Sequence, residues 1–225
     1  MIVTIHQPNY LPYLGFFDKM KKADVFVIYD DAQFNKADFQ HRNRIRIYSG
    51  WKWLTVPIVK KRIPINEILI KNNPDTKGVY WYDEHFAIIE KIYDHSPYFI
   101  QYEDKLKDIY SNHYEKLVDL NVAFIDLIKE GFDLKTDIVL SSEMGFDSSS
   151  TQKIIDIVET LGGDTYISGS MGRSYLDTTL FDKHGIDLQF QDFEHPVYNQ
   201  NYEDFVPNLS AIDALFNVGN VFDQK

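Results

Sequence analysis

A cluster of hydrogen-bonding side chains, residues 6–10, directly follows a short β-branched run near the start of the sequence. It precedes a helix start, where backbone N–H groups attract phosphate. The cluster is therefore a candidate phosphate site. A structural role, in which His6 and Asn9 only satisfy backbone groups of the loop, explains the same residues. The candidate ligands in this cluster are His6, Gln7, Asn9 and Tyr10.

A second candidate anion site lies between residues 167 and 175, where a strand-like run ends in a loop with two glycines, serine hydroxyls and one arginine. Glycine lets the backbone approach a ligand closely, serine donates hydrogen bonds, and arginine offers a bidentate fork for phosphate. The alternative is a glycine-rich turn whose arginine pairs with a carboxylate such as Asp177. The candidate ligands here are Ser168, Gly169, Ser170 and Arg173.

A third set of polar residues spans positions 30–34 and 41–44. Its carboxylates could hold a hydrated Mg²⁺ while its arginines meet phosphate oxygens. A strand-end turn with a surface ion pair explains the same residues, so no metal ligand is assigned and a nucleotide accompanied by Mg²⁺ stays an open alternative. The candidate substrate ligands are Asp31, Gln33, Arg42, Asn43 and Arg44.

A fourth set, residues 194–200, is dense in side chains that can hydrogen-bond a polyhydroxyl or amide substrate. His195 can titrate near neutral pH and is a candidate acid or base, with Tyr198 and Gln200 as candidate ligands of the acceptor. A loop whose histidine is simply well bonded accounts for the pattern equally well.

Several reaction types have no support in the sequence. The chain has no cysteine, which excludes disulfides, thiolate metal sites and cysteine nucleophiles. The G-x-S-x-G, Walker A, G-x-G-x-x-G and H-E-x-x-H patterns are missing as well. The sequence therefore does not predict hydrolysis by a nucleophilic serine, nucleotide hydrolysis at a P-loop, or zinc-dependent hydrolysis.

The charge distribution points to a local anion site and not to a nucleic-acid track. The net charge is −11 over 225 residues, which combines +6 for residues 1–77 with −17 for residues 78–225. Overall acidity disfavours extended nucleic-acid binding. Residues 36–62 nevertheless carry eight basic residues and only Asp38 as an acid. This segment is either part of an anion site or a solvated basic face.

The elements at the start of the chain place residues 6–9 and 30–34 at one sheet edge. The pattern predicts a strand over 2–5, a helix over 13–22 and a strand over 24–29. Such a short βαβ unit links parallel neighbours of an α/β sheet, and ligands gather at the carboxyl ends of such strands. Residues 6–9 and 30–34 are therefore expected to line one crevice.

The rest of the chain extends this architecture. We expect a hairpin of 43–48 and 51–57, then helices over about 76–131 ending at a Gly131 C-cap. Strands are predicted at 137–140, 164–168 and 186–190, and helices after a Ser149–Gln152 capping box, at 174–183 and at 209–216. The prediction is a single α/β domain, 1–225, with a mostly parallel Rossmann-like (nucleotidyltransferase-like) sheet, a β-hairpin and a helical insertion at about 76–131.

The start of the sequence lacks a basic region followed by a long apolar run, and no stretch approaches about 20 apolar residues. The sequence therefore predicts a cytoplasmic protein without a membrane span.

Taken together, short motifs along nearly the whole chain resemble the WbqC-like family. The resemblance implies a cytoplasmic role in making or modifying an activated sugar for bacterial O-antigen or another surface polysaccharide. The motifs that carry it are His6 to Gly15, Ala23 to Phe26, Asp31 to Phe34, Arg42 to Ile45, Trp53 to Pro57, Ser168-Gly169, Tyr175-Leu176, His195 to Gln200, and Leu209 to Gly219.

A more distant resemblance links two loops to the nucleotidyl-transferring α/β enzymes. His6-x-Pro8-Asn9 is similar to their H-x-G-H motif, and the segment from Ile167 to Arg173 is similar to their I-S-S-T-x-x-R loop. The resemblance implies that these loops stabilise charge on a transferred phosphate by electrostatics and positioning. This chain has Pro8 and Asn9 where that motif has glycine and a second histidine.

These observations lead to two hypotheses. In the first, the protein is a transferase that holds a nucleotide or nucleotide-sugar phosphate with His6, Asn9, Ser170 and Arg173 and moves a nucleotidyl, acyl or aminoacyl group. In the second, it is a noncatalytic nucleotide-sugar-binding partner of polysaccharide-biosynthesis enzymes, for which Asn9 in the place of histidine is the feature to weigh.

Overall fold

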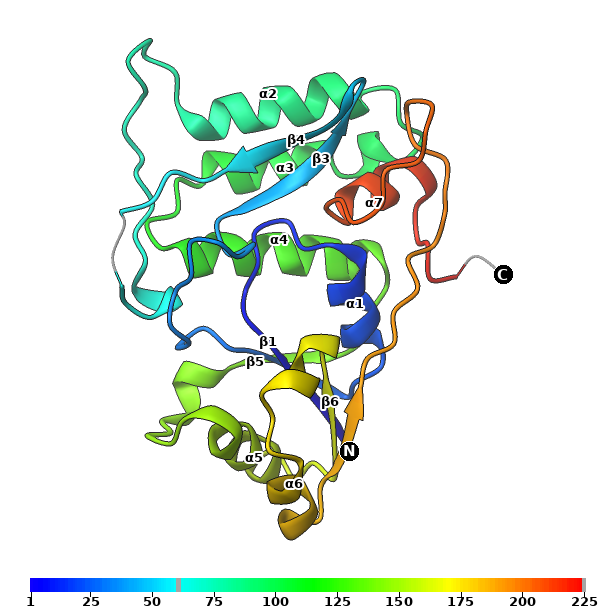
Figure 1. The fold of residues 1–225 in the computed structure, drawn as a ribbon. Coiled ribbons are helices and arrows are strands. Elements are labelled where there is room, and N and C mark those ends of the chain that lie inside the picture. Colours follow the sequence, from blue (N-terminus) through cyan, green and yellow to red (C-terminus); the bar gives the residue numbers. More distant parts are fainter. Residues whose placement is uncertain (60–61, 224–225) are drawn as a thin grey trace. The chain divides into compact units, whose positions relative to one another are not determined.

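The computed structural model describes residues 1–59 and 62–223 and divides into two compact units (Figure 1). Unit 1 comprises Met1–Gln7, Gly15–Ala32 and Leu134–Glu194, and unit 2 comprises Pro8–Leu14, Gln33–Asp133 and His195–Lys225. Each unit is described by itself. The assignment of the chain to one domain stays a prediction. No helix of the described residues is both long and apolar enough to cross a membrane.

Unit 1 is built on a five-stranded parallel sheet, as the sequence predicted. The sheet order is β5-β2-β1-β6-β7, so the chain adds strands on one side of β1 and then returns to its other side with β6. The strands are β1 (Ile2–His6), β2 (Val25–Ile28), β5 (Asp137–Leu140), β6 (Thr165–Ser168) and β7 (Asp187–Phe190).

Helices cover both faces of this sheet because successive strand residues point to opposite faces. Val3, Ile5 and Val27 pack into an apolar core with α5 (Ser150–Thr160) and α6 (Thr178–His184). On the other face, Phe16 of α1 (Leu14–Lys21) contacts Phe26 with 4.8 Å between ring centroids. The unit also contains the short 3₁₀ helices η3 (Ser141–Met144) and η4 (Ser170–Ser174).

Unit 2 combines the predicted hairpin with the predicted helices. Strands β3 (Arg42–Ile47) and β4 (Gly50–Thr55) pair antiparallel, with Arg44 opposite Trp53. The helical segment between this hairpin and β5 is confirmed. The remaining elements of this unit are η1 (Ile65–Glu67), α2 (Trp81–Tyr93), η2 (Phe99–Gln101), α3 (Glu103–Ser111), α4 (Leu117–Gly131) and α7 (Ile212–Val218).

Four local expectations were wrong. Helix α7 begins at Ile212 and not at Leu209, because Ser210 forms an antiparallel bridge with Tyr13. Helix α6 begins at Thr178 and not at Ser174, because the Asp177 side chain caps it by accepting a 3.0 Å bond from the Thr179 N–H. Ser149 makes no capping bond at the start of α5. Gly131 is the last residue of α4 and not its left-handed cap. A Cβ at this position would lie 2.8 Å from a methyl carbon of Leu215, so close packing explains this glycine.

Candidate functional site

The candidate site of unit 1 lies at the carboxyl edge of its sheet, where the strand order reverses. Strands β1 and β6 are parallel neighbours with Thr4 opposite Ile167, so the same register places His6 level with Gly169. The Thr4 hydroxyl donates a buried 2.7 Å bond to the Ile167 carbonyl and ties the two strands together. Open α/β sheets bind ligands outside the carboxyl ends of strands at such a reversal.

The His6 side chain is a neutral imidazole whose Nε2 atom carries no proton. Its Nδ1 lies 2.9 Å from the Gln7 carbonyl oxygen, which can only accept, so Nδ1 carries the proton and Nε2 keeps a lone pair. Burial, with a smaller effect of the Lys19 charge, lowers the pKa of His6 to about 3. The ring packs edge-on against Phe16, with 4.8 Å between ring centroids. His6 is therefore uncharged at neutral pH and can accept a hydrogen bond through Nε2.

Lys19 lies beneath this strand end and was not predicted as a site residue. Its side chain is 2% exposed, and its Nζ donates a 2.9 Å bond to the Ile5 carbonyl. Burial lowers its pKa to about 7. The available signal was its place three residues after Phe16, since residues three apart share a helix face and Phe16 is core.

The loop after β6 approaches the sheet edge closely because of one glycine. A Cβ on Gly172 would lie 2.1 Å from the Ser168 hydroxyl and 3.0 Å from a methyl carbon of Leu176. The Ser168 hydroxyl donates to the Gly169 carbonyl over 3.1 Å. The loop thus has no room for a side chain at position 172, and it folds as the single turn η4 that carries Ser170 and Arg173.

Arg173 is exposed, and its guanidinium carbon lies 4.3 Å from the centroid of the Phe190 ring. Within residues 1–59 and 62–223 it forms no ion pair. Asp177, the partner weighed in the sequence-based alternative, uses its carboxylate to cap α6. The Arg173 guanidinium therefore keeps its N–H groups for an external anion.

Asp31 belongs to a set of polar groups that satisfy one another after β2 and β5. Lys153 forms a 2.5 Å ion pair with Asp31, and the Ser141 hydroxyl donates to the same carboxylate over 2.6 Å. Asp30 accepts from the backbone N–H and hydroxyl of Ser142. Across the described residues, no group of three His, Cys, Asp or Glu side chains could hold a metal ion. The sequence analysis did not predict Lys153 as a partner of Asp31. Lys153 lies next to the apolar residues of α5, and its position in the sequence does not reveal a contact with Asp31.

Three predicted ligands in unit 2 hold the chain together. The Tyr10 hydroxyl bonds His85 over 2.9 Å and Tyr110 over 2.6 Å in the core of this unit. Asn43 donates to the Leu11 carbonyl over 2.7 Å, and Gln33 donates to the Ile63 carbonyl over 3.0 Å. These three side chains therefore bond other groups of the protein. Asn9, the remaining candidate ligand of the loop in unit 2, is buried, with 8% of its surface exposed.

The residues predicted to face an acceptor surround a buried carboxylate in unit 2. Asp213 is 0% exposed and accepts 2.8 Å bonds from Tyr93, Tyr198 and Gln200. Burial raises its pKa. The Nδ1 of His195 donates to the Pro196 carbonyl over 2.8 Å, and burial lowers its pKa. Tyr198 thus bonds Asp213, and Gln200 bonds both Asp213 and the backbone of Val206.

Arg42 and Arg44 stack on the tryptophans of the facing strand. The guanidinium carbon of Arg42 lies 4.5 Å from the Trp53 centroid, and that of Arg44 lies 5.2 Å from Trp51 and 5.7 Å from Trp53. Both arginines are on β3 in unit 2, whereas Asp31 is in unit 1.

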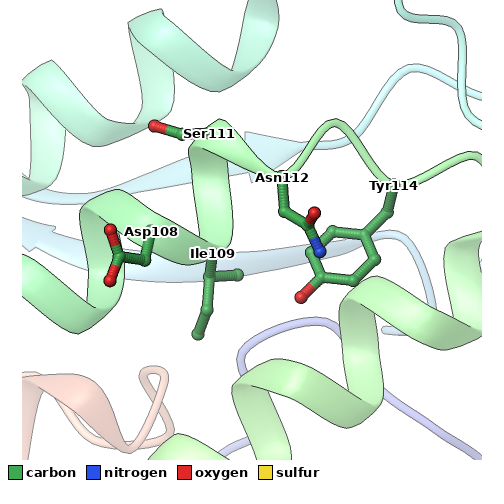
Figure 2. A pocket seen from close by; sticks show the side chains of 5 residues that line it. All are labelled: Asp108, Ile109, Ser111, Asn112 and Tyr114. Atoms are coloured by element: carbon green, nitrogen blue, oxygen red, sulfur yellow. The ribbon is translucent and has the colours of Figure 1, made fainter.

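A pocket of about 440 Å³ lies at the end of α3 in unit 2 (Figure 2). Its walls include none of the predicted site residues, and Asp108 is the single charged side chain among those that line it. Figure 2 shows the lining residues Asp108, Ile109, Ser111, Asn112 and Tyr114.

Comparison with known proteins decides the family. The model of the WbqC-like protein family matches residues 7–222. The chain belongs to the WbqC-like protein family. This WbqC-like chain is 33% identical over 222 residues to the uncharacterized protein Rv1507c of Mycobacterium tuberculosis (strain ATCC 25618 / H37Rv), covering 96% of this chain and 94% of that protein.

A second relative of this WbqC-like chain matches only in part. It is 30% identical over 121 residues to a UDP-N-acetylmuramoylalanine–D-glutamate ligase of Fusobacterium nucleatum subsp. nucleatum, which covers 53% of this chain and 26% of the ligase. No solved structure matches the WbqC-like chain significantly.

Proposed function

We propose that the protein is a transferase that binds a nucleotide or nucleotide-sugar phosphate at the carboxyl edge of the unit 1 sheet. The observation that carries the proposal is the pairing of β1 with β6 at the strand-order reversal, which brings His6 and the loop of Arg173 to one edge. In the family context, the substrate belongs to surface-polysaccharide biosynthesis.

Arg173 is assigned to the phosphate. Its guanidinium has no carboxylate partner in the described residues and is oriented by the ring of Phe190. A planar fork of N–H groups suits two phosphate oxygens at once. Ser170 and the backbone of Gly169 stand beside it as further donors in the same loop.

His6 is assigned to the acceptor and not to the phosphate. Because its Nδ1–H is directed to the Gln7 carbonyl and its pKa is about 3, Nε2 offers a lone pair and no N–H at neutral pH. A neutral imidazole in this state can accept a hydrogen bond from an attacking hydroxyl or amine and so position it. The transferred group is nucleotidyl, acyl or aminoacyl.

Binding of nucleotides tests the proposal most directly. The ligase that shares 30% identity with about half of the chain is named for UDP-N-acetylmuramoylalanine, a nucleotide sugar, so UDP-linked N-acetyl sugars are the first ligands to titrate by calorimetry. Arg173→Ala is expected to weaken binding about tenfold or more, since a charge-assisted bidentate contact is lost. Arg173→Lys should recover part of the affinity.

Arg62→Ala is the matched control because it removes one exposed arginine from unit 2. Its affinity should equal that of the unchanged protein. Equal affinity of the Arg173→Ala variant for every nucleotide sugar that binds would contradict the assignment. Binding without turnover, together with co-purification of a sugar-modifying enzyme, would favour the noncatalytic partner described above.

A further inference from the structure

We propose that one face of the β3–β4 hairpin is a binding platform for a short acidic saccharide, a sugar chain that carries carboxylate or phosphate groups. Its members are Phe39, Arg42, Arg44, Trp51 and Trp53, and together they are called the Arg–Trp platform. The inference rests on unit 2 alone and does not depend on the phosphate site of unit 1.

The hairpin register builds this platform. Arg44 pairs with Trp53 across the strands, and residues two apart on one strand share a face, so the arginines of β3 and tryptophans of β4 alternate on the same side. The opposite side is anchored in the core by Ile45 and Leu54, which are 0% and 1% exposed. The platform is therefore a rigid surface supported from below.

Two of its three aromatic rings are exposed, and the third is partly exposed. Trp51 is 43% exposed and Phe39 is 38% exposed. Trp53 lies between them, with centroid distances of 5.7 Å to Trp51 and 5.8 Å to Phe39. Aromatic faces of this kind offer apolar contact to the C–H groups of a ring.

Its two guanidinium groups are held in place but are not neutralised. Arg42 donates to the Ala37 carbonyl over 2.9 Å, and Arg44 donates to the Asn208 carbonyl over 3.0 Å. Neither forms an ion pair with a carboxylate of residues 1–59 or 62–223. Arg46 on the same strand differs, because it is 1% exposed and bonds four backbone carbonyls.

The platform offers mainly hydrogen-bond donors, which defines the chemistry of its ligand. The guanidinium and indole N–H groups of the platform can only donate, and the hydroxyl of the neighbouring Thr55, opposite Arg42, can also accept. A ligand rich in oxygen acceptors and negative charge is complementary to such a surface. Nucleobases carry donors and acceptors in equal measure and fit less well.

Size and charge separate a saccharide from macromolecular partners. A standard protein interface takes about 20–30 residues on each side, whereas this platform is made of five side chains. The chain has a net charge of −11, which opposes a long, highly charged nucleic-acid backbone more strongly than a short ligand with few charges. A short saccharide with a few anionic groups matches both limits.

The three tryptophans provide the test, because each gives one indole N–H signal in a ¹⁵N NMR spectrum of the full chain. Trp81 serves as the internal reference because it is not part of the platform. Its indole N–H donates a 3.1 Å hydrogen bond to the side-chain oxygen of Asn72. Trigalacturonic acid is the probe, and neutral maltotriose is its comparison. We expect trigalacturonic acid to shift the Trp51 and Trp53 signals and to leave the Trp81 signal in place.

Substitutions then test the role of charge. The double variant Arg42→Ala/Arg44→Ala should bind trigalacturonic acid about tenfold more weakly, or weaker still. The single variants Arg42→Lys and Arg44→Lys keep the positive charge, so they should lose less affinity and give an NMR spectrum close to that of the unchanged protein. Lys52→Ala is the matched control, because Lys52 pairs with Ile45 and lies on the other side of the hairpin. Tyr48→Ala removes an exposed ring outside the platform.

Three results would overturn the proposal. The first is an absence of Trp51 and Trp53 shifts at millimolar trigalacturonic acid. The second is equal binding of maltotriose, which would remove the role of the arginines. The third is a stronger response to an oligothymidylate or to a hexaglutamate peptide, which would assign the platform to a nucleic acid or to an acidic protein segment.

Discussion

At the carboxyl edge of the unit 1 sheet, His6 keeps a bare Nε2 and Arg173 a guanidinium without a carboxylate among the described residues. In unit 2, Asp213 accepts bonds from Tyr93, Tyr198 and Gln200. The side chains in both places are of types that perform chemistry. They differ in whether their polar atoms are already used within the protein, and that difference separates a candidate site from a structural network.

The largest effect is expected from breaking the network of unit 2. Asp213→Asn leaves one oxygen for three donors, so we expect a loss of about 3 kcal/mol in the free energy of unfolding. Urea denaturation measures it. Asp182→Asn, at an exposed position of α6, is the control and should change stability little. A loss below about 1 kcal/mol would mean that the network contributes little to folding.

Lys19 gives the next largest effect, through pH. Its pKa is about 7 in the folded chain and 10.5 in the unfolded chain, so the unfolded chain binds more protons between these values and stability rises with pH. We expect the free energy of unfolding to increase by about 2 kcal/mol from pH 7 to pH 9.

Lys19→Met should abolish this rise, and Lys52→Met, at an exposed position, should preserve it. The measurement is urea denaturation at several pH values. A rise of equal size in the Lys19→Met variant would assign the pH dependence to other groups.

A smaller effect is expected from the cap of α6. The Asp177 carboxylate accepts from both the N–H and the hydroxyl of Thr179, so Asp177→Ala should cost about 1 kcal/mol. Asp182→Ala removes the same charge near the other end of α6 and serves as the control. Thermal denaturation checks the difference, and equal melting temperatures would show that the cap is dispensable.

The smallest effect on stability should come from Arg173→Ala, because this residue is exposed and loses only its contact with Phe190. We expect a change of about 0.5 kcal/mol in the free energy of unfolding, although the same variant is expected to lose nucleotide affinity. A loss comparable to that of Asp213→Asn would place Arg173 with the structural network, and the comparison between the units would fail.

The sequence predicted the elements well where local patterns decide them. The β-branched runs at 2–5 and 24–29 became β1 and β2, and Ser49-Gly50 marked the hairpin turn. Local patterns failed where side chains compete for the same groups. Ser148 and Gln152 both bond Asp156, and Ser149 leaves the start of α5 without a side-chain cap.

The use of polar atoms could not be predicted, because it depends on residues distant in sequence. The sequence alone predicts Tyr198 and Gln200 as substrate ligands, whereas in the structure both bond Asp213. It likewise gives no sign that Lys19, near the end of a helix, donates to the Ile5 carbonyl. Strand order was equally hidden. The loops that follow β1 and β6 are about 160 positions apart in sequence, and the pairing of β1 with β6 makes them neighbours.

The contact at Gly172 sets a limit on how this protein can vary. Even a methyl group there would collide with the hydroxyl of Ser168, so a library that randomises the loop should return glycine at this one position whatever it returns at Met171 or Ser174. Substitutions intended to change what this loop binds will therefore have to work through the flanking side chains and leave this residue untouched.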